Sequence, residues 1–421
     1  MTRTYTFRDG GLNSPLLRGL NTLGALVGGV GVELVSLDPD ALVEAAIKKA
    51  GSSDLGSDSY REPLERYCAS LAEEARLSTF GRLAVRGMIV GSLATRIELH
   101  AWMKANPKAR EERIVRPWII VGLPRTGTTL LSQLLALDPV ARAPLQWETR
   151  SPVPPATISG AAEDPRIAEC AKTLDQLVRL NPAIQAMHPF GAMLAEECVP
   201  FFLLDLRTLG METQGLVPSY GAWLQACDMR SAYAQHRSAL QALQTGQPTE
   251  NWVLKTPNHL WALETLLEFY PDARLIWTHR DPGPVVTSVA SLNTTMQRTF
   301  SDHVDPVAVG QDWKQKLKHA VDLGMAHDDR AEPGWCVHVG YAEMMRDPLA
   351  ALRRIYRHFG DEPSRLHERR VEAWLLDRHQ SVHGRHRYDP ADFGWSDDGL
   401  NEEFSAYRER FQIEPEKRQV G

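Results

Sequence analysis

Residues 122–129, with the sequence GLPRTGTT, have the residue types and spacing of a loop that binds a phosphate group. They follow an apolar run at 118–121 and precede apolar residues at helical spacing, so they join a predicted strand to a predicted helix. The two glycines allow a tight turn, and N–H groups at a helix start attract an anion. A plain strand-to-helix turn could use the same glycines. The residues predicted to contact the anion are Arg125, Thr126, Gly127, Thr128 and Thr129.

The position of the cation distinguishes this loop from the loops of nucleoside triphosphatases. The spacing matches G-x-x-x-x-G, but Thr128 stands where those enzymes carry the lysine that reaches the terminal phosphates. The cationic side chain lies inside the loop instead, at Arg125. No predicted strand ends in an obvious aspartate that could hold Mg²⁺. A nucleotide kinase or hydrolase is therefore the weaker alternative, and the sequence predicts no metal site.

A second candidate anion site follows the apolar run at 274–278. Arg280 stands at the end of this predicted strand, and Ser288 comes eight residues later, in the next predicted helix. An arginine offers a planar fork to phosphate oxygens, and a serine offers a hydroxyl donor. The alternative is an arginine that simply pairs with a carboxylate. Beside a phosphate loop, the two residues favour a second phosphate clamp.

The elements that position these residues alternate between short apolar runs and helical patterns. The runs lie at 118–121, 252–254, 274–278 and 336–339. Such alternation predicts an α/β fold, with a P-loop-like central parallel sheet and helices on both of its faces. We expect a helical N-terminal region at 1–112, an α/β domain at 113–421 and a helical insertion at about 160–248. In the N-terminal region, Asp38 or Asp40 is expected to cap a helix.

The composition argues against several classes of protein. Lys plus Arg is 47 and Asp plus Glu is 53, so the net charge of −6 disfavours a general nucleic-acid binder. None of the five cysteines forms a C-x-x-C pair, which is typical of a reducing compartment. The first residues do not resemble a secretory signal, so we expect a cytoplasmic protein. The apolar segment 19–32 is too short to span a bilayer; it packs on the main domain or makes weak contact with a membrane surface.

Taken together, the two anion motifs resemble those of the PAPS-dependent sulfotransferases, where PAPS is 3′-phosphoadenosine-5′-phosphosulfate. The chain is most similar to the bacterial group with a helical N-terminal region, and it resembles protein-tyrosine sulfotransferases around the two motifs. Further matches lie at 147–150, 253–256, 337–341 and 383–388. The resemblance implies that the loop holds the 5′-phosphosulfate, that Arg280 and Ser288 hold the 3′-phosphate, and that Tyr341 lines the donor site. The product would be PAP, adenosine 3′,5′-bisphosphate.

The resemblance also implies roles in sulfuryl transfer. Arg125 and Lys255 would stabilise the charge that develops on the leaving group. Glu148 matches the glutamate of a Glu-Thr-Arg element and is the predicted base, with a pKa raised by burial beside Trp147. A structural ion pair of Glu148 with Arg150 is the alternative. His259 is the second candidate for the base.

The acceptor is expected to bind against the helical insertion. His188, Glu196 and Glu197 lie in this segment, and two adjacent glutamates on a helix cannot share one face. The resemblance implies a hydroxyl acceptor that is a small or lipid-like molecule, without nucleic-acid or transmembrane partners. The N-terminal helices would shape the mouth of the acceptor site or support a homodimer. A non-catalytic, nucleotide-binding member of the fold is the remaining alternative.

Overall fold

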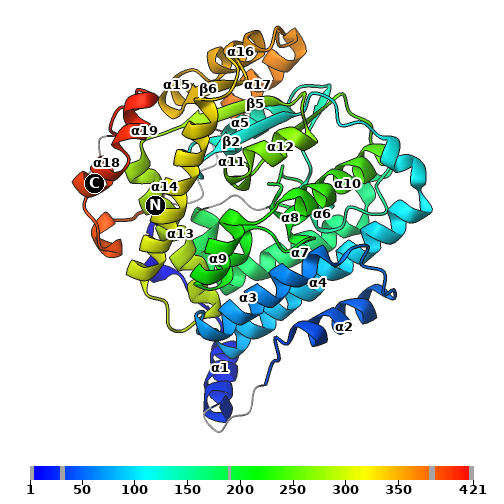
Figure 1. Ribbon diagram of the computed structural model, residues 1–421, viewed down its shortest axis with the longest axis vertical. Coiled ribbons are helices and arrows are strands. Elements are labelled where there is room, and N and C mark those ends of the chain that lie inside the picture. Colours follow the sequence, from blue (N-terminus) through cyan, green and yellow to red (C-terminus); the bar gives the residue numbers. More distant parts are fainter. Residues whose placement is uncertain (1–3, 29–33, 188–190, 379–384, 417–421) are drawn as a thin grey trace.

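A five-stranded parallel sheet forms the centre of the protein in the computed structural model, which describes residues 4–28, 34–187, 191–378 and 385–416. The strand order is β3-β4-β2-β5-β6, and each neighbouring pair is parallel (Figure 1). The strands are β2 (Trp118–Gly122), β3 (Ala141–Arg142), β4 (Asn251–Lys255), β5 (Arg274–His279) and β6 (Cys336–Gly340). All four predicted apolar runs are therefore strands of one sheet.

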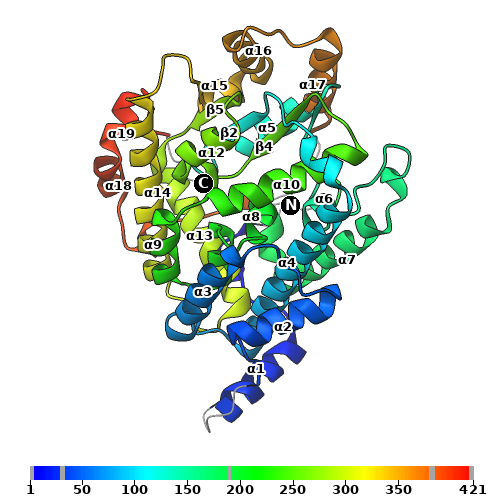
Figure 2. The same cartoon turned by 45° about the vertical axis from the view of Figure 1, so that its right-hand side comes forward.

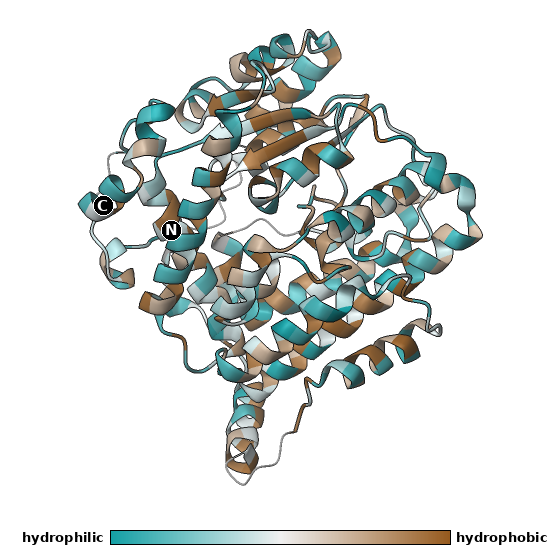
Figure 3. Cartoon of the chain, viewed as in Figure 1, coloured by the Kyte–Doolittle hydropathy of each residue, from teal (hydrophilic) through white to brown (hydrophobic). Residues whose placement is uncertain are grey.

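Helices cover both faces of the sheet, as the alternation of side chains along β2 shows. Ile119 and Val121 belong to one hydrophobic cluster, whereas Trp118 and Ile120 belong to another. Successive side chains of a strand point to opposite faces, so β2 contributes to a core on each side. Figure 3 shows these strands as an apolar centre inside more polar helices. The predicted α/β fold is confirmed.

The helices of this domain follow the strands in chain order. They are α5 (Thr128–Ala136), α11 (Asn258–Trp261), α12 (Leu263–Phe269), α13 (Pro282–Phe300), α14 (Pro306–Asp328), α15 (Tyr341–Arg346), α16 (Pro348–His358), α17 (Arg365–Arg378), α18 (Asp397–Glu403) and α19 (Ser405–Arg410). Short 3₁₀ turns complete the chain at Phe7–Asp9, Asp58–Tyr60, Pro107–Glu111, Ala161–Glu163, Pro182–Ala186, Leu209–Gln214 and Pro390–Phe393.

The N-terminal region is helical, and it lies on the side of the molecule opposite α16 (Figures 1 and 2). Its helices are α1 (Pro15–Gly28), α2 (Pro39–Ala50), α3 (Arg61–Glu73) and α4 (Thr79–Ala105). Asp38 caps α2, because its carboxylate accepts from the N–H of Ala41 at 2.9 Å. Strand β1 (Thr4–Tyr5) pairs with β7 (Arg385–His386), which places the start of the chain beside its C-terminal part.

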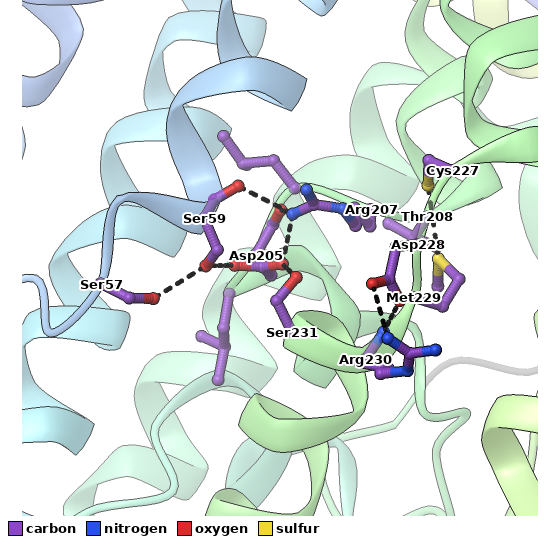
Figure 4. A network of polar contacts seen from close by, with 12 residues as sticks. Ser57, Ser59, Asp205, Arg207, Thr208, Cys227, Asp228, Met229, Arg230 and Ser231 are labelled. Atoms are coloured by element: carbon purple, nitrogen blue, oxygen red, sulfur yellow. Dashed lines mark hydrogen bonds and ion pairs between the residues drawn. The ribbon is translucent and has the colours of Figure 1, made fainter. Parts of the chain in front are cut away.

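The insertion is also helical, with α6 (Gln146–Arg150), α7 (Pro165–Leu180), α8 (Val199–Leu203), α9 (Pro218–Ala226) and α10 (Arg230–Gly246). A buried polar network joins it to the N-terminal helices around Asp205 (Figure 4). The Asp205 carboxylate accepts from Arg96 of α4 at 2.7 Å and from Ser231 of α10 at 2.6 Å. The N-terminal helices and the insertion also contribute to one hydrophobic core. A boundary at residue 112 stays a prediction about the sequence.

No helix in the described ranges is both long enough and apolar enough to cross a membrane.

Candidate functional site

The loop between β2 and α5 has a backbone that glycine makes possible. Gly122 has φ 135° and Gly127 has φ 88°, backbone conformations that residues with a β-carbon rarely adopt. A β-carbon on Gly122 would lie 2.7 Å from the carbonyl oxygen of Thr278 on the neighbouring strand β5. The loop is therefore folded tightly against β5. This packing brings residues 122–129 next to the chain that continues into Arg280.

The threonines of the loop have different environments. Thr126 is fully buried; its hydroxyl donates to the Leu123 carbonyl at 2.7 Å and lies 2.7 Å from the Thr278 hydroxyl. Its side chain therefore holds the loop closed rather than facing a ligand. Thr128 and Thr129 are the first residues of α5 and are half-buried. Because Gly127 has no side chain to cap this helix, the N–H groups of its first turn are available to an anion.

Arg125 and Arg280 lie side by side at the mouth of this loop. One guanidinium nitrogen of Arg280 donates to the carbonyl oxygen of Arg125 at 2.8 Å. Arg125 itself donates to the carbonyl oxygen of Met187 at 2.7 Å. Burial lowers the pKa of Arg125, and the neighbouring Arg280 lowers it further. The mutual repulsion of two neighbouring cations would be relieved by a bound anion. The two predicted anion motifs are therefore in direct contact.

The Arg280 guanidinium is occupied by a carboxylate from the C-terminal segment. Glu416 accepts from it through both carboxylate oxygens, at 2.6 and 2.8 Å. Arg280 also lies over the ring of Tyr341, 4.0 Å from its centroid. Burial lowers the pKa of Arg280, but Glu416 and Tyr341 more than offset this and raise it overall. The arginine–carboxylate pairing considered from the sequence is therefore present, inside the predicted anion site.

Two further residues complete the surroundings of the arginines. Ser288 is buried on α13, the helix that follows Arg280. Tyr388, in the C-terminal part of the chain, acts electrostatically on both Arg125 and Arg280. Of the C-terminal segment compared at 383–388, His383 and Gly384 lie outside the described residues, and Arg385 and His386 form β7.

Lys255 ends β4 and forms a buried ion pair with the insertion. Its side chain is only 3% exposed, and its ammonium donates to Glu197 at 2.8 Å. Glu197 is 22% exposed, and its own N–H donates to the side chain of Glu196 at 2.7 Å. The sequence placed Glu197 on the acceptor side without assigning it a partner. The only feature of the sequence that drew attention to Glu197 was its position next to Glu196.

Glu148 is buried, and its two oxygens have separate partners. One oxygen binds the guanidinium of Arg142, and the other accepts from the N–H of Leu145 at 3.0 Å. The partner is therefore Arg142 of β3, not Arg150. Arg142 also donates to the Gln247 carbonyl at 3.0 Å, so this pair ties β3 to the end of α10. The Glu148 side chain is 1% exposed.

His259 lies in the core behind β4. It is fully buried, and its Nδ1 lies 2.8 Å from the hydroxyl of Tyr233. Burial lowers the pKa of His259 well below its usual value, and the neighbouring His236 lowers it further. The ring is therefore neutral and closed off from solvent. His188, also considered for the acceptor side, lies outside the described residues.

The glycine loop, Lys255 and Arg280 follow or end three neighbouring parallel strands, β2, β4 and β5. The sequence model of the sulfotransferase family matches residues 117–363, which contain all of these elements. The chain belongs to the sulfotransferase family. It is therefore a transferase, as the resemblance predicted.

Mycobacterial proteins are among the relatives and solved structures to which the chain is similar. The chain is 30% identical over 271 residues to the omega-hydroxy-beta-dihydromenaquinone-9 sulfotransferase Stf3 of Mycobacterium tuberculosis, covering 62% of this chain and 67% of the relative. Sulfotransferase STF9 from Mycobacterium avium superposes with a TM-score of 0.82 at 30% identity, over 90% of this chain and 98% of that one. For STF1 from M. tuberculosis the TM-score is 0.79 at 28% identity, over 87% and 98%.

Proposed function

We propose that this protein is a PAPS-dependent sulfotransferase that acts on the hydroxyl of a lipid-like acceptor. One observation carries the proposal most directly: the 2.8 Å hydrogen bond from Arg280 to the backbone of Arg125. It joins the loop before the N-terminus of α5 to the residue that follows the neighbouring strand β5. PAPS carries anionic groups at both its 5′ and 3′ positions, so a single donor molecule matches the paired sites.

The residues present fit such a donor. The N–H groups of Thr128 and Thr129, together with Arg125, would hold the 5′-phosphosulfate. Arg280 and Ser288 would hold the 3′-phosphate, with Tyr341 packed against the arginine. When bound, the donor supplies an activated sulfuryl group. Lys255 would place positive charge where the leaving phosphate becomes more negative.

The acceptor hydroxyl needs a group that takes its proton. Glu197 fits this role, because it is partly exposed and its carboxylate lies at the Lys255 ammonium. The ion pair fixes the carboxylate beside the residue that would face the leaving group. Glu148 stays the candidate predicted from the sequence. Its two partners, Arg142 and the Leu145 N–H, favour a positioning role for it.

A lipid-like acceptor is favoured by a relative and by the surface of α1. The similar M. tuberculosis protein is named for a menaquinone derivative with a hydroxyl group. In this chain, α1 exposes three leucines: Leu16 is 83% exposed, Leu23 56% and Leu26 69%. Such a helix can lie on a membrane surface where a lipid acceptor resides. A cytoplasmic location and a homodimer stay predictions.

Calorimetric binding of PAP, ADP and ATP tests the donor assignment. PAP is expected to bind best, and Arg280→Ala is expected to weaken it by about 1.5–3 kcal/mol, the range for a lost charge-assisted hydrogen bond. Arg353→Ala is the matched control, because Arg353 also pairs with a carboxylate, Glu368, but on the exposed face of α16. Sulfate transfer from labelled PAPS to lipid alcohols then tests the reaction.

Two results would contradict this assignment. Equal or tighter binding of ATP, with no effect of Arg280→Ala, would favour a nucleotide kinase or hydrolase. Specific PAP binding without transfer to any hydroxyl acceptor would favour a non-catalytic, nucleotide-binding protein.

A further inference from the structure

Three potential metal ligands meet in the core behind Lys255. Cys198, His236 and His259 each offer one ligand atom, and these atoms lie within 4.8 Å of one another. All three side chains have no exposed surface. They come from different elements: Cys198 is the residue before α8, His236 is on α10 and His259 is on α11 (Figure 1). The N–H of Cys198 donates to the Lys255 carbonyl at 2.8 Å, which places the cluster directly behind the end of β4.

Each histidine is bound through Nδ1 to a buried tyrosine. His259 Nδ1 lies 2.8 Å from the hydroxyl of Tyr233, and His236 Nδ1 lies 2.7 Å from the hydroxyl of Tyr270. The Nε2 atoms of both rings are buried and have no hydrogen-bond partner among the described residues. Two orphaned nitrogens on rings whose centroids lie 5.9 Å apart are unusual, because an unpaired buried polar atom costs free energy.

The tyrosines explain how these nitrogens could serve as ligands. When Nδ1–H donates to the tyrosine oxygen, the proton is fixed on Nδ1. The lone pair of Nε2 is then available to a metal ion. Histidines that bind metals commonly donate their other N–H to a polar partner in this way. The opposite tautomer would leave a buried Nε2–H donor with no acceptor. A cation satisfies both nitrogens at once.

The chemistry of the ligand set selects the cation. One thiolate and two neutral imidazoles are the ligands of Zn²⁺ and Cu⁺, whereas Mg²⁺ and Ca²⁺ require oxygen ligands. The surroundings are apolar and aromatic: the ring of Phe202 lies over His236 with centroids 5.2 Å apart. Binding at about 2.0–2.3 Å would draw the three ligands closer together. The thiol proton would leave to solvent, and the imidazoles would stay neutral.

We propose that Cys198, His236 and His259 form a buried site for a thiophilic d¹⁰ cation, Zn²⁺ or Cu⁺. The cation links α8, α10 and α11 behind the strand that carries Lys255. Its place in the core makes it a structural site that supports the reaction centre without facing it. Nothing in the assigned transfer reaction requires this site.

Metal analysis of the untagged protein, purified without chelators, tests the site directly. About one zinc or copper ion per chain is expected. Refolding with each metal in turn shows which of the two is retained. Refolding with Co²⁺ as a probe should give a thiolate-to-cobalt charge-transfer band, which reports the cysteine ligand in the unmutated protein. A chain that neither contains zinc or copper nor takes up any of the three ions on refolding would overturn the proposal.

Variants test the ligand assignment. Cys198→Ala should lose the charge-transfer band and most of the bound metal, and His236→Gln should bind metal more weakly. Cys170→Ala is the matched control, because Cys170 is a buried cysteine in a separate hydrophobic cluster. Metal and band retained in Cys198→Ala, or lost equally in Cys170→Ala, would show that the ion binds elsewhere.

Discussion

The ion pair between Lys255 and Glu197 concentrates the chemistry of the site in two side chains. It joins the end of β4 to the segment that precedes α8, at 2.8 Å. Glu148, by contrast, is held from both oxygens by Arg142 and the Leu145 backbone. The two carboxylates also differ in exposure, because the Glu197 side chain is 22% exposed and the Glu148 side chain 1%.

Replacing each glutamate in turn distinguishes their roles. Glu197→Gln keeps the shape and removes the proton acceptor, so turnover should fall by about 10²–10⁴-fold, the range for a lost general base. Glu148→Gln breaks the buried pair with Arg142, so it should mainly lower the melting temperature. Steady-state rates corrected for folded protein measure both effects. A large loss of turnover in Glu148→Gln with Glu197→Gln near the unmutated rate would restore Glu148 as the base.

Glu416 occupies the same guanidinium fork that the proposed 3′-phosphate requires. Its two oxygens lie 2.6 and 2.8 Å from Arg280, so a phosphate must displace it. Glu416→Ala should therefore tighten PAP binding several-fold, since a partly exposed ion pair contributes about 1 kcal/mol or less. Glu414→Ala, an exposed neighbour in the same segment, is the control. Titration calorimetry measures both variants, and an unchanged or weaker affinity in Glu416→Ala would show that the carboxylate does not compete.

Helix α1 has one side that is anchored to the protein and one side that is exposed. Asn21 is buried and accepts from the N–H of Phe80 at 2.9 Å, which fixes α1 against the start of α4. The leucines at 16, 23 and 26 face away from this anchor and are largely exposed. The sequence left packing and membrane contact as alternatives. The structure shows the packing on one side and leaves an apolar surface on the other.

Vesicle flotation tests whether this surface binds lipid. Changing the three leucines to glutamine should abolish most of the vesicle-bound fraction, because each buried leucine contributes roughly 1.5–3 kcal/mol. The control is a triple glutamine variant of Val140, Ile158 and Leu376, which are also exposed but lie elsewhere in the sequence. Equal vesicle binding by the α1 variant and the unmutated protein would exclude α1 as the contact.

Asp205 connects two large parts of the molecule, the N-terminal helices and the insertion. Its carboxylate has no exposed surface and binds Arg96 at 2.7 Å. It also binds Arg207 at 2.5 Å (Figure 4). Asp205→Ala leaves buried cations unpaired, so it should lower the free energy of unfolding by about 3–5 kcal/mol. Asp228→Ala, which breaks an exposed pair with Arg230, should cost about 1 kcal/mol or less. Denaturant unfolding compares the two, and a similar small cost for both would contradict the role of Asp205.

The buried ring of His279 is expected to make the stability of the protein depend on pH. His279 and His338 share a hydrogen bond of 2.9 Å between β5 and β6, and the ring of Phe411 stacks on His279 with centroids 4.0 Å apart. Burial lowers the pKa of His279 well below its usual value, and His338 lowers it further. The unfolded chain therefore takes up this proton first, at about pH 6.5. The stability due to the neutral ring is present above that pH and is lost as the pH falls.

Unfolding curves measured between neutral pH and pH 5 check this sign. The free energy of unfolding should decrease as the pH falls, and His279→Asn should make the decrease less steep. His319→Asn, at an exposed position, is the control and should keep the slope of the unmutated protein. An identical slope in His279→Asn would assign the acid sensitivity to other groups.

Features of the protein that depend on local patterns could be predicted from the amino-acid sequence. Neighbouring residues specify the alternating strands and helices, the glycine loop at 122–129 and the cap at Asp38. The reason is that periodicity and backbone freedom act over a few positions. The closeness of Arg125 and Arg280 also followed, since parallel strands end at one edge of a sheet.

Contacts between side chains that are distant in the sequence became known from the folded structure. Glu197 pairs with Lys255, Glu416 reaches Arg280, and Cys198 joins His236 and His259. None of these residues is adjacent to its partner in the sequence, and no local period relates them. Their contacts depend on how the insertion and the C-terminal segment pack on the sheet. That packing follows from burial of apolar surface, which is non-directional and specifies no particular pair in advance.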